Sequence, residues 1–255
     1  MIDFHSHVVF DVDDGAKTIE DSILMIKEAS KAGYTDIIAT PHYMEGYYVI
    51  PKSKIKEKID YLNKVSEQNG IGVKIHQASE IYFTDSIIQL INNGLASTVN
   101  NSKYILLETP MLSEPLNLLQ VIYQILEAGK TPIIAHPERY TFIQQDPNKV
   151  YNLIEEGVLF QCNMGSLMGL YGKEAKKTIT QLLKNNMVHF MGSDTHRPDT
   201  IYKNMGKALY ELEKILPNDK VIKITYENPQ KVLNNEEIEI EEPTEIKNNF
   251  FKKFF

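Results

Sequence analysis

The stretch that decides the fold is LEAGKTPIIAHPER, residues 126–139, in which a helix ends, a glycine turns the chain and an apolar strand runs into a histidine. Gly129 stands just past the helical pattern, where a left-handed C-terminal cap favours glycine. Thr131 to Ala135 is short and apolar, as expected of a strand buried on both faces. His136 follows where this strand ends. The order of elements predicts one unit of a parallel α/β sheet.

The same unit recurs along the chain. Gly33 and Gly157 each follow a helical pattern and precede an apolar strand. The predicted strands are Ile2 to His5, Asp36 to Thr40, Val73 to Ser79, Tyr104 to Thr109, Thr131 to Ala135, Val158 to Cys162 and Val188 to Gly192. Seven strands alternating with helices predict an α/β fold, and at this length a closed, TIM-like (β/α)7 barrel in a single domain.

Two helix predictions follow from local patterns. Leu116 to Glu127 carries Leu119, Ile122 and Leu126 at helical spacing, so these three side chains are expected on one face. Asn228-Pro229 has the form of an N-cap followed by proline at the first helical position, which predicts a helix start there.

The barrel domain is expected to cover residues 1–233, with residues 234–255 as a C-terminal tail. Residues 236–245 of this tail are acidic and expected to be solvated. Phe250 to Phe255 is aromatic and basic, and two readings stay open for it: a solvated end, or a weak peripheral contact with an anionic membrane surface.

Composition excludes several classes of protein. The chain has 255 residues, a net charge of -7 and a pI near 5.6, which argue against a nucleic-acid binder. Its apolar runs are too short to span a membrane, and its N-terminus has no signal-peptide pattern, so a cytoplasmic location is expected. The single cysteine, Cys162, suits a reducing compartment. A cysteine-nucleophile phosphatase needs arginine six residues later, where this chain has Met168.

Histidines and carboxylates cluster where the predicted strands end, at the rim on which parallel barrels carry their active sites. Five of the seven histidines lie there, whereas His76 and His189 lie earlier in their strands. The rim candidates are His5, His7, His42, Glu80, Glu108, His136, Asp194 and His196. Imidazole and carboxylate ligands without cysteine suit a catalytic site for zinc, manganese or iron. The sequence therefore predicts a cluster of two or three metal ions.

The segment Asp11-Val12-Asp13-Asp14-Gly15 has three readings. Asp14 is the preferred metal ligand, with Asp11 and Asp13 on a solvated loop. A plain Asp/Gly turn without a ligand is the second reading. The third is the nucleophile motif of haloacid dehalogenase phosphatases, which wants threonine or valine at the position of Gly15 and leaves the histidines unexplained.

These motifs resemble the PHP (polymerase and histidinol phosphatase) superfamily. The residues that carry the resemblance are the initial His-x-His, Asp13-Asp14-Gly15, Thr40-Pro41-His42, Glu80, His136-Pro137-Glu138-Arg139 and Ser193-Asp194-Thr195-His196. The match is closer to the bacterial manganese-dependent protein-tyrosine phosphatases of capsule and exopolysaccharide gene clusters. It covers residues 1 to about 233.

The resemblance implies a distorted seven-stranded barrel of PHP type with a trinuclear centre. By this resemblance, the first metal is held by His5, His7, Glu80 and Asp194, the second by Glu80, Glu108 and His136, and the third by Asp14, His42 and His196. The metal is expected to be Mn²⁺, with Fe, Zn, Co or Mg as alternatives. The implied substrate is the phosphotyrosine-containing C-terminal tail of a membrane-associated bacterial tyrosine kinase that controls polysaccharide export.

The chain uses arginine at only two places among 27 basic residues, Arg139 and Arg197, and each lies within three residues of a predicted ligand. The planar guanidinium binds phosphate oxygens in a bidentate manner, so both are substrate-binding candidates, with Arg139 also catalytic. Tyr48, in the loop after His42, is a candidate for stacking on an aromatic substrate. His42 and His196 are candidate proton donors to the leaving group where they are not fully ligated.

Two other functions stay open. A histidinol-phosphate or other small-molecule phosphatase of the same superfamily would use the same centre. A metal-binding scaffold without turnover predicts missing ligands, and every predicted position carries a competent one.

Overall fold

The computed structural model describes residues 1–247 of the chain. Its strands are β1 (Ile2–Ser6), β2 (Asp36–Ala39), β3 (His42–Tyr43), β4 (Lys74–Gln77), β5 (Glu80–Tyr82), β6 (Tyr104–Glu108), β7 (Thr131–Ala135), β8 (Leu159–Asn163) and β9 (Phe190–Gly192). The helices before β8 are α1 (Ile19–Lys31), α2 (Lys52–Gln68), α3 (Ile87–Asn92), α4 (Leu118–Glu127), α5 (Thr141–Gln145) and α6 (Asn148–Glu155). Those after it are α7 (Met164–Leu167), α8 (Gly172–Lys184), α9 (Met205–Glu213), α10 (Asn218–Ile222) and α11 (Asn228–Leu233). Short 3-10 turns lie at Val99–Asn101, Pro137–Arg139 and Tyr202–Asn204.

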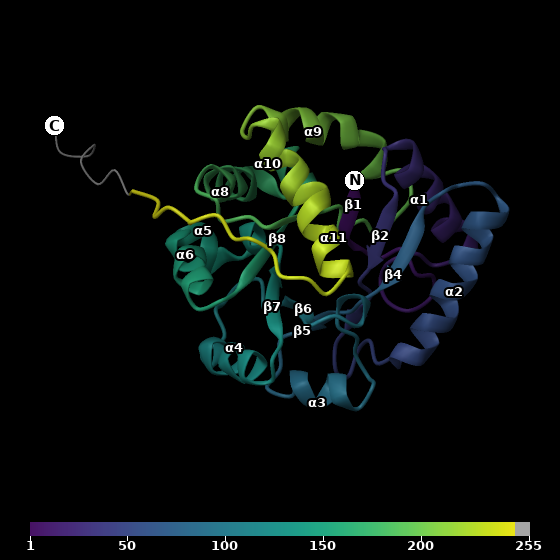
Figure 1. The fold of residues 1–255 in the computed structure, drawn as a ribbon, viewed down its shortest axis with the longest axis horizontal. Coiled ribbons are helices and arrows are strands. Elements are labelled where there is room, and N and C mark those ends of the chain that lie inside the picture. The colour runs from purple at the N-terminus through teal and green to yellow at the C-terminus, as the bar shows by residue number, and fades with distance from the viewer. Residues whose placement is uncertain (248–255) are drawn as a thin grey trace.

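Every strand pairs with its neighbours in parallel, in two sheets of order β1-β2-β4 and β3-β5-β6-β7-β8-β9. The end of β1 meets the segment after β9 through a parallel bridge between Ser6 and Thr195, and the Asp194 N–H donates to the His5 carbonyl over 2.7 Å. Figure 1 shows the curled sheet with helices around its outside, as the βαβ order requires. The expected α/β fold with a curled parallel sheet is confirmed.

The two sheets meet where two strands are interrupted. Thr40 and Pro41 separate β2 from β3, and Ala78 and Ser79 separate β4 from β5. Pro41 has no N–H for the ladder, yet its carbonyl accepts from the Glu80 N–H over 3.1 Å. Each of the seven predicted strand regions contains a strand, and the interruptions raise the number of segments to nine.

Two local predictions are wrong. In α4 the buried residues are Leu118, Val121, Ile122 and Ile125, while Leu119 is 48 % exposed. The buried face is therefore turned by about one residue from the predicted one. Asn228 is the first residue of α11 but not an N-cap, because it has helical φ and ψ and follows directly on a π-helical turn over Lys223–Glu227. That wider turn precedes Pro229, which cannot donate to a regular α-helical ladder.

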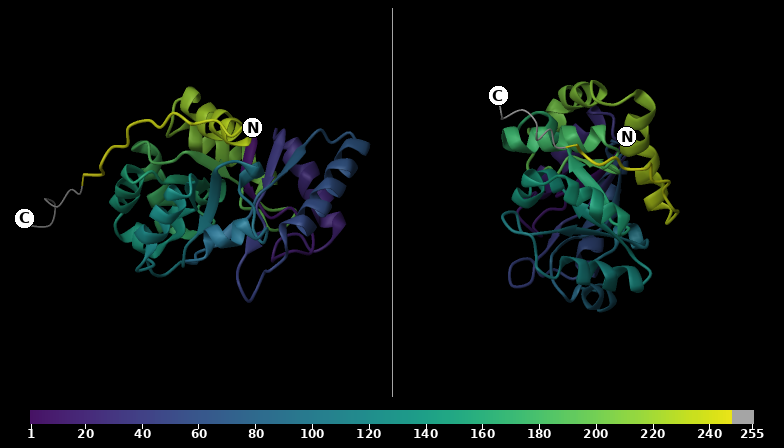
Figure 2. Two further views of the ribbon diagram at one scale, coloured as in Figure 1. Left: turned by 60° about the horizontal axis from the view of Figure 1, so that its bottom comes forward. Right: turned by 90° about the vertical axis from the view of Figure 1, so that its left-hand side faces the viewer.

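The acidic segment after α11 has mostly exposed side chains, as predicted, but its backbone is hydrogen-bonded to the domain. Residues 235–247, which we call the C-terminal strap, leave the end of α11 and run across the domain past α5 and α6, as the yellow segment of Figure 1 shows; Figure 2 shows the same segment from two other sides. Tyr104 Oη donates to the Glu236 carbonyl over 2.7 Å, and the Thr244 N–H donates to the Asn185 carbonyl over 3.0 Å. Near its end, the Ile246 N–H donates to Asn148 Oδ1 over 2.8 Å. The predicted aromatic and basic end, Phe250 to Phe255, lies outside the described residues.

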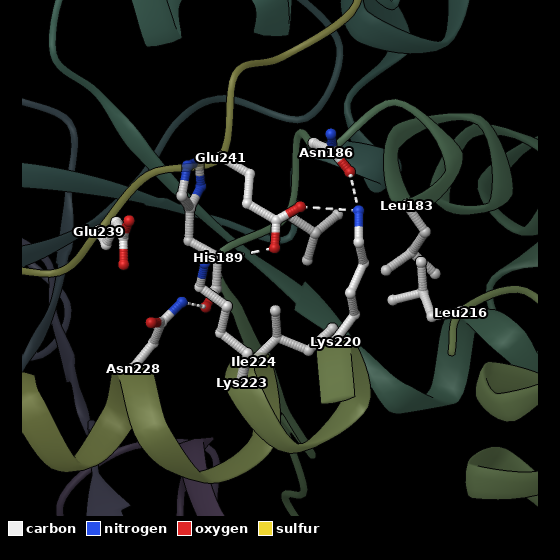
Figure 3. A pocket seen from close by; sticks show the side chains of 11 residues that line it. Leu183, Asn186, His189, Leu216, Lys220, Lys223, Ile224, Asn228, Glu239 and Glu241 are labelled. Carbon is white, nitrogen blue, oxygen red and sulfur yellow. Dashed lines mark hydrogen bonds and ion pairs between the residues drawn. The ribbon is translucent and has the colours of Figure 1, made fainter. Parts of the chain in front are cut away.

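The strap also closes a small cavity of about 30 Å³ beside His189 (Figure 3). Glu241 of the strap lies between two lysines, with 2.7 Å to Lys220 Nζ and 3.2 Å to Lys223 Nζ. The ammonium groups hold the pKa of Glu241 below its ordinary value. No helix within residues 1–247 is both long enough and apolar enough to cross a membrane.

The strap contacts predict a stability effect. A chain that ends at Asn235 is expected to melt several °C lower than the full chain, since about 1 kcal/mol shifts the Tm of a domain this size by about 2–4 °C. A chain that ends at Lys247 keeps the described contacts and is the matched control. Differential scanning calorimetry measures both, and equal Tm values for the two truncations would contradict a stabilising strap.

Candidate metal centre

The nine predicted ligands come together at the carboxyl ends of the strands. His5 lies in β1 and His7 just after it, His42 begins β3, Glu80 begins β5 and Glu108 ends β6. His136 follows β7, and Asp194 and His196 follow β9. Asp14 comes from the loop between β1 and α1. His76 pairs with Asp36 over 2.7 Å, and His189 accepts from the Phe160 N–H over 3.1 Å, so both lie apart from this cluster.

Glu80 is the centre of the cluster. Its Oε2 lies 3.1 Å from His5 Nε2 and 3.1 Å from His42 Nδ1. Its Oε1 lies 2.9 Å from His136 Nε2. Glu80 is fully buried, so one carboxylate faces three imidazoles from three strands. Such a carboxylate has the geometry to bridge two cations.

Three groups of candidate ligand atoms each lie within 4.8 Å of one another. The groups are His5, His7 and Glu80; His42, Glu80 and Glu108; and His7, Asp14, His42 and His196. Asp194 adjoins the first group, with its Oδ1 at 3.6 Å from His5 Nε2 and 3.5 Å from His7 Nε2. His136 and Asp194 both have left-handed backbones, with φ of 34° and 52°. Non-glycine residues in this region are uncommon and concentrate at functional sites.

Asp13 orients two of these ligands, a role that the sequence did not reveal. It was predicted on a solvated loop, but it is buried, and its Oδ2 accepts from His7 Nδ1 over 2.7 Å and from the His42 N–H over 2.9 Å. Its Oδ1 accepts from the Gly15 N–H over 2.8 Å. A Cβ on Gly15 would lie 2.3 Å from the His7 carbonyl oxygen, so only glycine lets this loop lie so close to β1. Asp11 behaves as predicted, with a side chain that is 82 % exposed.

Strand β8 supplies two further supporting residues that sequence reasoning missed. Gln161 Oε1 lies 2.8 Å from His5 Nδ1, which leaves His5 Nε2 facing the centre. Asn163 Nδ2 donates to Asp194 Oδ2 over 2.7 Å. Both amides are fully buried, at alternate positions of a strand whose other residues are apolar. That alternation of polar residues in a buried strand was the available signal.

The buried carboxylates of the centre favour positive charge around them. Burial disfavours charged His5, yet Glu80 and Asp194 outweigh this and raise its pKa to about 9. Burial, together with the carboxylate of Glu80, raises the pKa of Glu108 to about 8. Carboxylates packed this closely repel one another unless cations lie between them. Asp14 Oδ1 and His136 Nδ1 are buried without a hydrogen-bond partner among residues 1–247. This donor set of imidazoles and carboxylates fits divalent metal ions.

The predicted substrate-binding residues occupy different environments. Arg139 Nη1 donates to Asp194 Oδ2 over 2.8 Å, and its guanidinium lies 4.4 Å from the ring centre of Tyr171. Arg197 Nη1 donates to the backbone carbonyls of Asp14, Gly15 and His196, so it holds the Asp14 loop in place. Its contact with substrate stays a prediction.

The tyrosines near His42 differ in accessibility. The ring of Tyr48 stacks on that of His42 at a centroid distance of 5.8 Å. Tyr43 is buried in the core, whereas Tyr47 is among the most exposed apolar side chains. Of the three, Tyr48 is therefore the one placed against a candidate ligand.

A curled parallel sheet with this cluster at its carboxyl rim defines the class of metal-dependent hydrolases with TIM-barrel-like folds. The chain belongs to the family described as capsular polysaccharide synthesis, CpsB/CapC, whose model matches residues 1–234. The expected kinship with bacterial metal-dependent protein-tyrosine phosphatases of capsule gene clusters is thereby confirmed.

Relatives of known name cover nearly the whole chain. The tyrosine-protein phosphatase YwqE of Bacillus subtilis is 34 % identical, with 100 % of both chains covered. The tyrosine-protein phosphatase CpsB of Streptococcus agalactiae is 30 % identical, with 92 % of this chain and 99 % of CpsB covered.

One solved structure superposes on this chain with a TM-score of 0.90. It belongs to a set described as YwqE from Bacillus subtilis and CpsB from Streptococcus pneumoniae, unique metal-dependent tyrosine phosphatases. It is 34 % identical and covers 97 % of this chain and 100 % of its own. The lactonase Lmo2620 of Listeria monocytogenes, 12 % identical with a TM-score of 0.58 over 92 % of this chain and 95 % of its own, shares the fold alone.

Asp13→Asn tests the orienting role of Asp13. The amide has one oxygen where the carboxylate has two, so it cannot accept from His7 Nδ1–H and the His42 N–H and also from the Gly15 N–H. Its neutral oxygen is also a weaker acceptor, so the His7 tautomer that offers Nε2 to the centre loses support. Affinity for Mn²⁺ is expected to fall about 10- to 100-fold, the usual effect of losing such a partner. Calorimetric titration of chelator-treated protein measures it. Asp11→Asn, the same change on an exposed side chain two residues away, is the control, and equal affinities would contradict the role.

Proposed function

We propose that the chain is a metal-dependent phosphotyrosine-protein phosphatase of capsular and extracellular polysaccharide synthesis. Its proposed substrate is the C-terminal tail of a membrane-associated bacterial tyrosine autokinase, which it meets in the cytoplasm. The observation that carries the proposal is the complete rim cluster around Glu80, with Arg139 beside it, in a chain whose relatives are named tyrosine-protein phosphatases.

We assign the ligands in three sets that share Glu80 or adjoin one another. The first set is His5, His7, Glu80 and Asp194, the second is Glu80, Glu108 and His136, and the third is Asp14, His42 and His196. The close approach of Asp194 to His5 and His7 supports the first, and the contact of His136 with Glu80 supports the second. Mn²⁺ is the proposed metal, with Fe, Zn, Co and Mg as alternatives that the same donor atoms accept.

The chain's own residues divide the remaining work. Divalent metals, when bound, supply Lewis acidity that lowers the pKa of water and offsets the charge of a phosphoryl group. Among residues 1–247, Arg139 is hydrogen-bonded to Asp194 through Nη1, and its other guanidinium nitrogens form no hydrogen bond, so they can bind a phosphate oxygen. His196 and His42 are partly exposed and can give a proton to the leaving oxygen where they are not ligated. A tyrosine leaving group, with a pKa of about 10, needs this help less than an alcohol does.

The fold is proposed to be a distorted seven-stranded barrel over residues 1–233. Counting β2 with β3, and β4 with β5, as single interrupted strands gives seven. The Ser6 to Thr195 bridge supports closure between the first and last of them. The interruptions fall just before His42 and Glu80, so the distortion serves the metal centre.

The first test is phosphate release from protein reconstituted with Mn²⁺. A phosphotyrosine peptide is expected to be hydrolysed in preference to a phosphoserine peptide and to histidinol phosphate, and chelation or Glu80→Gln is expected to abolish activity. Preference for histidinol phosphate would keep the centre but replace the substrate. No release with any divalent metal would favour a metal-binding scaffold.

Arg139→Lys tests the role of the guanidinium. Lysine keeps the positive charge near Asp194 but loses the planar fork that binds phosphate in a bidentate manner. The value of kcat/KM for a phosphotyrosine peptide is expected to fall about 100-fold, the usual size for one transition-state donor, while Mn²⁺ affinity stays within about threefold. Unchanged kinetics would exclude Arg139 from the reaction.

A further inference from the structure

A second cavity lies along the segments that follow two candidate ligands, His42 and Glu80. It has a volume of about 220 Å³ and is lined by Tyr43, Met44, Glu45, Tyr82, Phe83 and Thr84. These residues come from the two segments that follow His42 in β3 and Glu80 in β5, which pair in parallel with His42 opposite Glu80. The cavity is smaller than the pockets that enclose whole ligands of drug size, and its volume suits one long side chain.

Two backbone contacts join this cavity to the candidate ligands. Tyr82 lies two residues beyond Glu80 and is paired in register with Glu108. The Phe83 N–H donates to the Glu108 carbonyl over 2.8 Å. On the other side, the Met44 N–H donates to the carbonyl of Tyr48, whose ring stacks on His42. Walls of the cavity are therefore neighbours of His42, Glu80 and Glu108 along β3, β5 and β6.

The chemistry of the cavity is aromatic within and acidic at its edge. Tyr43 is buried, Tyr82 and Phe83 are half-buried, and Glu45 is exposed. Aromatic walls accept the apolar stem of lysine or arginine, and both ring faces and a carboxylate attract its charged end.

We infer that this cavity is a substrate subsite that takes a lysine or arginine side chain two positions from the phosphotyrosine of a protein substrate, an inference that rests on the proposed function. In an extended peptide, residues two apart point to the same side and lie about 7 Å from each other. This matches the two-residue step from Glu80 to Tyr82 along β5. The subsite gives the enzyme a preference for sequence that the metal cluster alone does not provide.

The test uses nine-residue peptides with a central phosphotyrosine and alanine elsewhere. Lysine, norleucine or glutamate replaces alanine two positions before or two positions after the phosphotyrosine. At one of the two positions, the full chain with Mn²⁺ is expected to show a KM about fivefold lower for lysine than for norleucine, the size of one part-exposed ion pair. Glutamate is expected to be the worst of the three, and kcat is expected to change little.

Two variants locate the effect. Glu45→Gln is expected to remove the advantage of lysine over norleucine, while Glu67→Gln, which removes an equal charge from the exposed face of α2, keeps it. Thr84→Phe fills the cavity and is expected to make lysine, norleucine and alanine peptides equivalent. Hydrolysis of p-nitrophenyl phosphate, which has no flanking residues, is expected to be unchanged in all three variants and reports that each is folded.

Three results would overturn the inference: no preference at either position, a preference for lysine that survives Glu45→Gln, or norleucine bound as well as lysine. In each of these cases the phosphotyrosine peptides and p-nitrophenyl phosphate are still hydrolysed, so the proposed function stands. Absence of hydrolysis of every substrate by the unaltered, metal-loaded chain would instead overturn the proposed function and the subsite with it.

Discussion

The burial of Glu80 among histidines is the constraint on which the rest of the structure depends. A fully buried carboxylate is costly unless opposite charge surrounds it, and here His5, His42 and His136 converge on it from different strands. The imidazoles hold the pKa of Glu80 well below its ordinary value despite burial. For the nearby Glu108, burial and the carboxylate of Glu80 have the opposite effect and raise its pKa. Cations between Glu80 and Glu108 would offset the repulsion between these two carboxylates.

The parallel sheet makes this convergence a consequence of topology. All strands point the same way, so residues far apart in sequence meet when each lies at a carboxyl end. The interruptions at Thr40-Pro41 and Ala78-Ser79 matter because they let β3 and β5 restart with a ligand as the first residue. The apolar residues within the strands form the core that stabilises the fold, so the residues at the rim are not needed for packing and can bind metal or substrate.

The sequence predicted the α/β fold with a parallel sheet and the gathering of the candidate ligands at one rim, because both rest on local patterns that repeat. An apolar run that ends in histidine, such as the one before His136, can be recognised in each strand without knowledge of the others. Asp13 was misread because its burial depends on Gly15 letting the loop lie against His7, a tertiary contact with no local signal. The strap was predicted to be solvated, which holds for most of its side chains, but its attachment through Glu241 to Lys220 and Lys223 is a tertiary contact with no local signal. Leu119 was predicted on the buried face of α4 but is exposed, because the buried face is turned by about one residue from the predicted one.

Exposure within the cluster defines the side from which a substrate arrives. His5, His7 and Glu80 are fully buried, whereas His42, His196 and Asp14 become progressively more exposed. Arg197 donates hydrogen bonds to the backbone carbonyls of Asp14 and Gly15 and so holds the loop that carries Asp14. The open side is therefore positioned by the protein itself, before any ligand binds. Rigid support beneath an accessible edge suits a site that receives a side chain of another protein. Tyr48, whose ring stacks on that of His42, belongs to this same open edge.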